Sequence, residues 1–477
     1  MIRAYTTEQV RAAEAIALRR FGEPTLMARA ARAVADAVIA RLASPLPART
    51  VVLLVGPGNN GGDALYAGAI LRRRGCTVAA VLAVPSRAHR EGLAVLRRAG
   101  GRVLGPDDPR LARLIGSADA IVDGLLGLGA TPPLRPPMDH LVKLAATTDG
   151  WRIAIDLPSG VDADTGCTDG PAFAADVTVT IGAMKSGLLL ADAVAGVVTV
   201  APIGMDPATL TPDALPDLVT LEEIDADAGV PEPGPGDDKF SSGVLGVLAG
   251  SDGYPGAAVL CVGGAVRTRP GLVRYAGPQS TAVLARWPEV VAAADPAHAG
   301  KVQAWVAGPG MGTDGAALDR LRTVLATDVP VLVDADGLTL LSRTPSLLAD
   351  RRRRNVPTLL TPHAGEFARL FPDLDPRDRL ASVRSAASRC GATVLLKGHR
   401  TVIAAPDGSA AVNTVTSSWL ATAGSGDVLS GVTGSLLAAG LAPIRAAALG
   451  AVLHGRAGTR AALDGRAGAS ALLDVLR

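Results

Sequence analysis

The sequence predicts two α/β domains, each built on a mainly parallel sheet, and three observations support this fold class. Short apolar runs such as Thr50–Val55 and Gly243–Gly250 are typical of strands that are buried on both faces. Helical patterns alternate with these runs, as in proteins whose helices cover both faces of a parallel sheet. The chain has 477 residues and is 48% apolar, which is enough material for two cores.

In the first half, the elements are predicted in the order helix, helix and then alternating strands and helices. Thr6 and Gln9 have the spacing of a helix capping box, and a second helical stretch runs from Thr25 to Leu42. Further helices are predicted at 64–75 and 91–99. The predicted strands are Thr50–Val55, Thr77–Val84, Ala118–Asp123, Arg152–Asp156 and Asp176–Gly182.

An acidic, proline-rich stretch separates the halves. Residues 205–238 contain no Lys or Arg, and Pro231–Gly236 (PEPGPG) can continue neither a helix nor a central strand. We therefore expect a first domain over residues 1–210, a linker over 211–238 and a second domain over 239–477.

The second half repeats the alternation. Strands are predicted at Gly243–Gly250, Ala304–Gly308, Pro330–Asp336, Pro357–Thr361 and Ala392–Gly398. The uncharged stretch Val428–Ile444 is shorter than a membrane span of about 20 residues and contains Pro443, so we interpret it as a buried helix. Ligands of open α/β sheets bind at the carboxyl ends of strands, so the polar clusters there should meet in one crevice.

Composition excludes several classes of function. Lys and Arg number 47 against 45 Asp and Glu, and aromatic residues make up only 3%, which argues against nucleic-acid and anionic-membrane partners. The four cysteines lie far apart in the sequence, as expected for reduced thiols. The charged N-terminal segment lacks the apolar core of a signal peptide. We expect a cytoplasmic enzyme that acts on small molecules.

Four clusters at strand ends carry the candidate chemistry of the first half. In Gly56–Asp63 (GPGNNGGD), glycines at a helix start suit a phosphate, and the Asn and Asp oxygens suit a cation or a sugar hydroxyl. Asp123 and Asp156 each end an apolar strand, where partial desolvation suits a base or a ligand. The fourth cluster contains Lys185. Taken singly, the first three clusters are also explained as helix or loop caps, and Lys185 is also explained as a solvated lysine.

Together these motifs resemble the YjeF N-terminal family of NAD(P)H-hydrate epimerases, which implies a Rossmann-like three-layer domain. The motifs are GPGNNGGD, DGLLGLG and IDLPSGVDADTG, in that order between Met1 and about Met205. The resemblance implies that Asp156 is the candidate base, and that Asn60, Asp123 and Ser159 bind potassium. It implies substrate-binding roles for Asn59, Asn60, Gly61, Gly62, Asp63, Gly127, Leu128, Gly129, Ala130, Thr131, Pro132, Pro133 and Asp156. Ala64 and Leu128 depart from the residues usual in the family, Gly and Thr.

The second half carries a more specific pattern, Ala423–Asp427 (AGSGD), in front of an apolar helical stretch. Small residues that enter a helix form an anion hole of backbone N–H groups. Asp427 would then lie where a carboxylate can take a proton from a hydroxyl that faces a phosphoryl group. The plainer interpretation is a glycine-rich helix start with an Asp in its first turn. The polar residues Asp334, Asp336, His363, Glu366 and Lys397 end or follow other predicted strands.

This half resembles ribokinase-like α/β proteins and, among them, the YjeF C-terminal NAD(P)HX dehydratase family. The motifs are GSGD, GSDGYPGAA, GPGMG, DADGL, TPHAGEFARL and LKGHRTVIAAPDG. The resemblance implies that Ala257, Gly310, His363 and Asp427 contact the hydrated dinucleotide. It implies that Lys397, Gly398, His399, Arg400, Thr401 and Gly426 hold the adenine nucleotide. Asn413–Leu420 departs from the Gly-Asn-Pro-Gly stretch that is common in the family. This departure affects the expected geometry of the lid over the nucleotide.

The two resemblances together imply a repair enzyme for hydrated nicotinamide cofactors. Hydration leaves a hydroxyl on ring carbon C6 in two epimers, which the first half would interconvert with potassium. The second half would dehydrate the S epimer with ADP and Mg²⁺. Since phosphate leaves more readily than hydroxide, the nucleotide would phosphorylate the alcohol, Asp427 would take its proton, and the ring nitrogen would expel phosphate. NADHX, NADPHX and adenine nucleotide are the expected partners, and a homo-oligomer is the expected assembly.

Two alternatives remain open from the sequence. A hydroxymethylpyrimidine-type small-molecule kinase with an accessory domain would share the second fold and release a stable phosphorylated product. In the other alternative, one domain has lost catalysis and serves in binding or assembly. The presence of both Asp156 and Asp427 argues against that reading.

Overall fold

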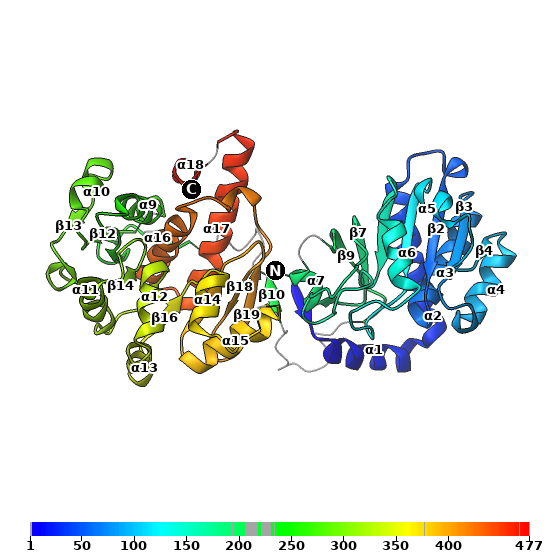
Figure 1. Ribbon diagram of the computed structural model, residues 1–477, viewed down its shortest axis with the longest axis horizontal. Coiled ribbons are helices and arrows are strands. Elements are labelled where there is room, and N and C mark those ends of the chain that lie inside the picture. The colour runs from blue at the N-terminus through cyan, green and yellow to red at the C-terminus, as the bar shows by residue number, and fades with distance from the viewer. Residues whose placement is uncertain are drawn as a thin grey trace. The chain divides into compact units, whose positions relative to one another are not determined.

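The computed structural model divides the chain into two compact units, an N-terminal unit over Arg3–Asp217 and a C-terminal unit over Leu218–Arg477 with Met1–Ile2 (Figure 1). It describes residues 2–191, 194–205, 218–220, 230–232, 234–268, 270–375, 377–466 and 468–476. Most of the segment 205–238, where we expected the linker, lies outside the described residues. The strand β10 (Leu218–Thr220) is a described part of it.

The N-terminal unit is built on a parallel sheet with the strand order β4-β3-β2-β5-β6-β7-β9. Its strands are β2 (Thr50–Val55), β3 (Thr77–Leu82), β4 (Arg102–Leu104), β5 (Ala120–Gly124), β6 (Trp151–Ile155), β7 (Val177–Ile181) and β9 (Val197–Ala201). All five predicted strands are present, and β4 and β9 are additional. A short parallel pair, β1 (Arg3–Tyr5) with β8 (Met184–Lys185), belongs to the same unit.

Helices cover both faces of this sheet, which gives the expected three layers. On β2, Val51 and Leu53 pack with α2 and α3, whereas Val52 and Leu54 pack with α5 and α6. The capping box predicted at the start of α1 is confirmed, with Thr6 and Gln9 exchanging side-chain-to-backbone hydrogen bonds. The helices are α1 (Thr7–Phe21), α2 (Glu23–Arg41), α3 (Asn59–Arg73), α4 (Arg90–Arg98), α5 (Leu111–Gly116), α6 (Met138–Ala145) and α7 (Ser186–Leu190).

The C-terminal unit has a mixed sheet with the order β13-β12-β11-β14-β15-β16-β17-β18-β19-β10. The pairings from β13 to β17 are parallel, and β18 and β19 add an antiparallel hairpin. The strands besides β10 are β11 (Val244–Leu248), β12 (Leu272–Tyr275), β13 (Val291–Ala292), β14 (Ala304–Ala307), β15 (Val331–Val333), β16 (Thr358–Leu360), β17 (Thr393–Leu396), β18 (Thr401–Ala404) and β19 (Ala410–Asn413). The predicted α/β fold class is therefore confirmed in both units.

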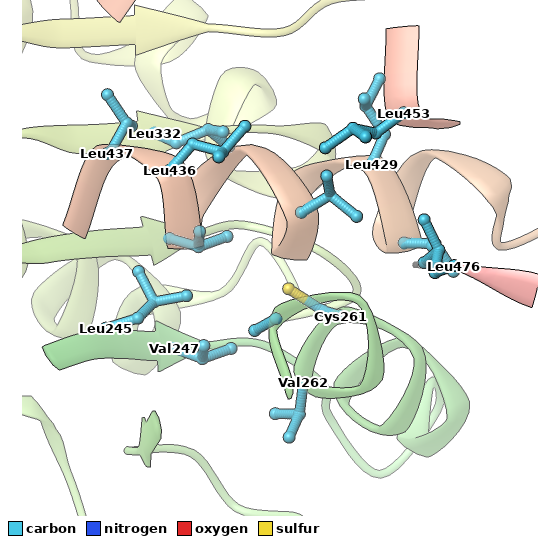
Figure 2. Packing of buried hydrophobic residues seen from close by; sticks show 14 of the residues in the cluster. Leu245, Val247, Cys261, Val262, Leu332, Leu429, Leu436, Leu437, Leu453 and Leu476 are labelled. Carbon is cyan, nitrogen blue, oxygen red and sulfur yellow. The ribbon is translucent and has the colours of Figure 1, made fainter. Parts of the chain in front are cut away.

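The largest core of this unit joins one sheet face to α9, α16, α17 and α18. Figure 2 shows Cys261 of α9 pointing toward α16, with Val262 on the opposite side of the same helix. The helices are α9 (Pro255–Arg267), α10 (Ser280–Arg286), α11 (Gly315–Leu325), α12 (Ala335–Arg343), α13 (Ser346–Arg353), α14 (Ala364–Leu370), α15 (Arg379–Cys390), α16 (Ser425–Ala438), α17 (Pro443–Leu463) and α18 (Ala469–Val475). The stretch Val428–Ile444 is helical only to Ala438, and Pro443 opens α17, where its missing N–H costs no hydrogen bond.

The four cysteines are free thiols, and Cys76 and Cys261 are buried. In the described parts of the chain, we find no helix that combines the length and the apolar character needed to cross a membrane.

Candidate functional site

A cavity of about 510 Å³ opens in the N-terminal unit, where residues that follow β2, β5 and β6 meet. We call it the N-terminal cavity. The predicted site residues that line it are Asn59, Asn60, Asp63, Gly127, Leu128, Gly129, Ala130 and Asp156. The predicted residues Gly61, Gly62, Thr131, Pro132 and Pro133 are outside this lining. A Cβ at Gly61 would overlap the backbone oxygen of Gly56, so this glycine lets α3 approach the loop that precedes it.

Asp156 directly follows β6 and is held in place by three hydrogen-bond donors. Its carboxylate accepts hydrogen bonds from the backbone N–H groups of Leu128 at 3.2 Å and Ile181 at 3.1 Å, and it forms an ion pair with Lys185. Its φ of 68° lies in the left-handed region, which costs free energy for a residue other than glycine and is typical of functional sites. Lys185 is only 1% exposed, and its Nζ also donates to Thr180 Oγ1 at 2.9 Å. The lysine of the fourth cluster is therefore buried against the candidate base and not solvated.

Two more carboxyl groups face the same cavity. Asp63, in the first turns of α3, is 8% exposed, and its Oδ1 has no hydrogen-bond partner among the described residues. Burial, and next the charge of Asp156, raise the pKa of Asp63 well above its usual range. Glu14 of α1 also lines the cavity, and burial raises its pKa too. Glu14 was not predicted, because nothing in the local sequence distinguishes it from a surface glutamate of an amphipathic helix.

The three predicted potassium ligands lie together behind this cavity. Asp123 is fully buried, and its carboxylate accepts hydrogen bonds from Ser159 Oγ at 2.8 Å and from Ser159 N at 2.7 Å. Asn60 Nδ2 donates to the carbonyl of Leu126 at 2.8 Å, and Leu126 N donates to Ser159 Oγ. Burial raises the pKa of Asp123 to about 6, and no cationic side chain pairs with it among the residues that the structure describes. A buried carboxylate with oxygen neighbours and no counter-charge fits a monovalent cation.

The C-terminal unit has its own cavity, of about 500 Å³, where the polar clusters after β15, β16 and β17 meet the start of α16. We call it the C-terminal cavity. The predicted residues His363, Lys397, Gly398, His399, Thr401, Gly426 and Asp427 line it. Ala257 and Gly310 are outside this lining but next to each other, since a Cβ at Gly310 would be 2.7 Å from that of Ala257. Arg400 is also outside the lining, and its Nη1 donates to the carbonyl of Thr414 at 3.2 Å.

A buried ion pair supports the start of α16. Lys397 Nζ donates to Asp334 Oδ1 at 2.7 Å, and Ser430 Oγ donates to Asp334 Oδ2 at 2.7 Å. A Cβ at Gly426 would be 3.4 Å from Lys397 Nζ, so the ammonium lies next to the helix N-terminus. Free N–H groups and a lysine at this position make a strong site for a phosphoryl group. Asp334 is the N-cap of α12, so the predicted strand Pro330–Asp336 is wrong beyond Val333.

Asp427 is poised to titrate near neutral pH. Burial, and next the charge of Asp334, raise its pKa to about 7, which is the range in which a carboxylate works well as a general base. His363 both caps a helix and lines the cavity. As the N-cap of α14, its Nδ1 accepts a hydrogen bond from the backbone N–H of Gly365 at 3.0 Å.

The helix α17 forms one wall of this cavity, which was not predicted from the sequence. His454 is 6% exposed, and its Nε2 lies 3.2 Å from Ser425 Oγ in the glycine-rich loop. Burial lowers the pKa of His454 to about 4, so the imidazole is neutral at pH 7. A histidine inside an alanine-rich helix carries no local signal that it faces a loop 29 residues away.

Comparison with known proteins agrees with both halves. Residues 23–187 match the family model of the YjeF-related protein N-terminus, and residues 245–475 match that of NAD(P)H-hydrate dehydratase. The bifunctional NAD(P)H-hydrate repair enzyme Nnr of Mycobacterium leprae is 47% identical over 95% of this chain and 93% of its own length. That of Corynebacterium glutamicum is 37% identical over 91% of this chain and 87% of its own length.

Among solved structures, the ADP/ATP-dependent NAD(P)H-hydrate dehydratase of Bacillus subtilis, co-crystallized with ATP/Mg²⁺, is 27% identical. It covers 54% of this chain and 96% of its own chain, with a TM-score of 0.48. The identity to the bifunctional relatives, which extends over both units, confirms the family resemblance stated from the motifs. This chain belongs to the family of bifunctional NAD(P)H-hydrate repair enzymes, Nnr.

Proposed function

We propose that the N-terminal cavity epimerises (R)- and (S)-NAD(P)HX and that the C-terminal cavity dehydrates the S epimer to NAD(P)H with ADP as phosphoryl donor. The observation that supports this most is the matched placement of two carboxylates. Asp156 and Asp427 each lie in the cavity of their own unit, at the carboxyl edge of a parallel sheet.

In the N-terminal cavity, Asp156 accepts a proton from the C6 hydroxyl of the substrate. Three donors already contact its carboxylate, so the side chain is fixed in orientation before substrate binds. Asn59 at the start of α3 and Gly127 and Gly129 after β5 line the cavity around it and would bind the dinucleotide through backbone and amide groups. Potassium would be held by Asn60, Asp123 and Ser159. Its positive charge would neutralise Asp123, and its contacts would link the segments that follow β2, β5 and β6.

In the C-terminal cavity, the N-terminus of α16 and Lys397 bind the phosphoryl group that is transferred. Asp427 takes the proton of the substrate hydroxyl as that hydroxyl oxygen attacks the terminal phosphorus of ADP. The bond from this phosphorus to the bridging oxygen breaks, AMP leaves with the electron pair, and C6 then carries a phosphate. The lone pair of the ring nitrogen expels that phosphate, and loss of a proton from C5 restores the ring double bond.

The residues of this cavity also fit Mg²⁺, which keeps several waters and is usually held by one or two carboxylates with substrate phosphates. Asp334 is 1% exposed and already bonded to Lys397 and Ser430. Glu366 lines the cavity and would hold the ion through water. Mg²⁺ would supply charge neutralisation on the nucleotide phosphates.

Single-site variants test this assignment on the full chain. Asp156→Asn should abolish conversion of (R)-NADHX to the S epimer and leave ADP-dependent dehydration of (S)-NADHX intact. Asp427→Asn should do the reverse. Loss of both activities in either variant, or of neither, would contradict the assignment. The small-molecule kinase alternative predicts a stable phosphorylated product of a pyrimidine alcohol, and the family membership of both halves disfavours it.

A further inference from the structure

The N-terminal cavity is lined by more carboxyl groups than cationic side chains. Three carboxyl groups line it, on Glu14, Asp63 and Asp156. Among the described residues that line it, Lys185 is the one cationic side chain, and it is bonded to Asp156. Asp63 and Glu14 therefore share a buried, low-dielectric space with an anion and without a cation of their own.

Asp63 and Asp156 have opposite surroundings. Asp156 has three hydrogen-bond donors, which favour its ionised form. Asp63 is more than nine-tenths buried, and its Oδ1 is a buried atom without a donor among the described residues, which favours its protonated form. When the environments of two neighbouring carboxyl groups differ in this way, one is suited to act as base and the other as acid.

The charged groups on the elements around α3 agree with a protonated Asp63. Asp156 and Glu14 face it and both raise its pKa. On β5, Asp123 is another buried carboxylate. His89 and Glu91, at the start of α4, are outside the cavity lining, and so are the charged residues of α2. No element packed against α3 thus brings a described cation into the cavity next to Asp63.

We propose that Asp63 is the proton donor of the epimerase, acting on the ring nitrogen of the substrate while Asp156 acts on the hydroxyl. This inference rests on the function proposed for the N-terminal cavity and adds the second catalytic group that the reaction needs.

The substrate makes such a pair useful, because C6 carries both the hydroxyl and the ring nitrogen N1. Asp156 takes the hydroxyl proton, the O–H electron pair forms C6=O, and the C6–N1 bond breaks. Its electron pair goes to N1, which takes the proton of Asp63. Rotation about C5–C6 presents the other face of the aldehyde. N1 then attacks C6 and returns its proton to Asp63, while Asp156 returns the hydroxyl proton, so no co-reactant is consumed.

Glu14 is the competing donor. It is only partly buried, on the helix α1. Burial and next the charge of Asp156 raise its pKa, but the charges of Lys185 and Arg11 act in the opposite direction. Its proton is therefore held less firmly than that of Asp63, which has neither influence acting on it. The two residues can be compared directly by isosteric substitution.

The experiment uses the full chain with purified (R)-NADHX and potassium, without nucleotide, and follows the initial rate of S-epimer formation by chromatography. Asp63→Asn should lower kcat by about 10²–10⁴-fold, change KM only a few-fold, and remove the decline of kcat at alkaline pH. Glu14→Gln should lose less than tenfold. Asp36→Asn, at an exposed residue of α2 paired with Arg32, is the matched control. ADP-dependent dehydration of (S)-NADHX reports that each variant is intact.

Three outcomes would overturn the inference. Asp63→Asn could keep more than a tenth of the wild-type kcat, or Glu14→Gln could lose activity in its place. The alkaline decline could also persist unchanged in Asp63→Asn. A wild-type chain that does not epimerise would overturn the function proposed for this cavity as well, whereas an active wild type with an inactive Asp156→Asn and an active Asp63→Asn would overturn only the role of Asp63.

Discussion

Replacing Asp427, the general base that we propose for the C-terminal cavity, should make the protein more stable at alkaline pH while it abolishes dehydration. The pKa of Asp427 is raised from 3.8 to about 7, first by burial and next by the charge of Asp334. The folded protein thus binds this proton more tightly than the unfolded chain does. Stability contributed by the protonated carboxyl is complete below about pH 4 and is lost as the pH rises to about 7.

The size of the effect follows from the displacement of this pKa. Each factor of ten in the ionisation constant corresponds to about 1.4 kcal/mol, so the charged carboxylate at pH 8 costs the folded state on the order of 4 kcal/mol. Asp427→Asn removes that cost and keeps the shape of the side chain. For a unit of this size about 1 kcal/mol shifts Tm by about 2–4 °C, so Tm at pH 8 should rise by roughly 10 °C.

Differential scanning calorimetry of the nucleotide-free full chain at pH 5 and pH 8 checks this prediction. At pH 5 the unfolded carboxyl, whose pKa is 3.8, is already mostly ionised, so about 1.6 kcal/mol of the difference is present and Asp427→Asn should unfold only about 3–6 °C above wild type. At pH 8 only the transition of the C-terminal unit should move upward in the variant. An equal shift at both pH values, or a less stable variant at pH 8, would refute the reasoning.

Three further predictions concern other parts of the molecule. Lys185→Met leaves the buried Asp156 carboxylate without its counter-ion. It should destabilise the N-terminal unit by about 3 kcal/mol in a denaturation assay and abolish epimerisation in a rate assay. The control variant Lys143→Met removes an exposed ion pair and should change neither the stability nor the epimerisation rate. Replacing potassium by a large organic cation should lower the epimerisation rate and leave dehydration of the S epimer unchanged, and Asp123→Asn should make the epimerase insensitive to potassium. Gly431→Ala places a Cβ onto a backbone oxygen of α9 and should destabilise the C-terminal unit by about 2 kcal/mol in urea titration, whereas at the open Gly315 the same change should be tolerated.

The central strands were predictable because their apolar runs are strong. The predicted bounds of β2, β5 and β6 agree with the structure to within two residues, since these strands are buried on both faces. The strands β1, β8 and β13 have two or three residues each and carry no periodicity that a sequence pattern can detect. The hairpin of β18 and β19 was missed for a different reason, because it adds antiparallel strands to a sheet whose local pattern predicts parallel ones.

The candidate sites were predictable where the chemistry lies at a strand end. Asp156 and Asp427 are each inside a cavity, as expected for residues at the carboxyl edge of a sheet. Glu14 and His454 reach the cavities from helices, and only tertiary packing decides which face of a helix points inward. The pairing of Lys185 with Asp156, 29 residues apart, likewise depends on how β8 returns to the end of β6.

The most direct test of the account is recovery of reduced-nicotinamide absorbance from a mixture of both NADHX epimers, with Mg²⁺ and potassium present, in the presence of ADP, of ATP and of no nucleotide. We predict complete recovery with ADP and none without nucleotide, because the N-terminal cavity keeps converting the R epimer into the S epimer that the C-terminal cavity dehydrates. Recovery that stops at the S-epimer fraction would contradict the epimerase assignment, and no recovery with either nucleotide would contradict the dehydratase assignment.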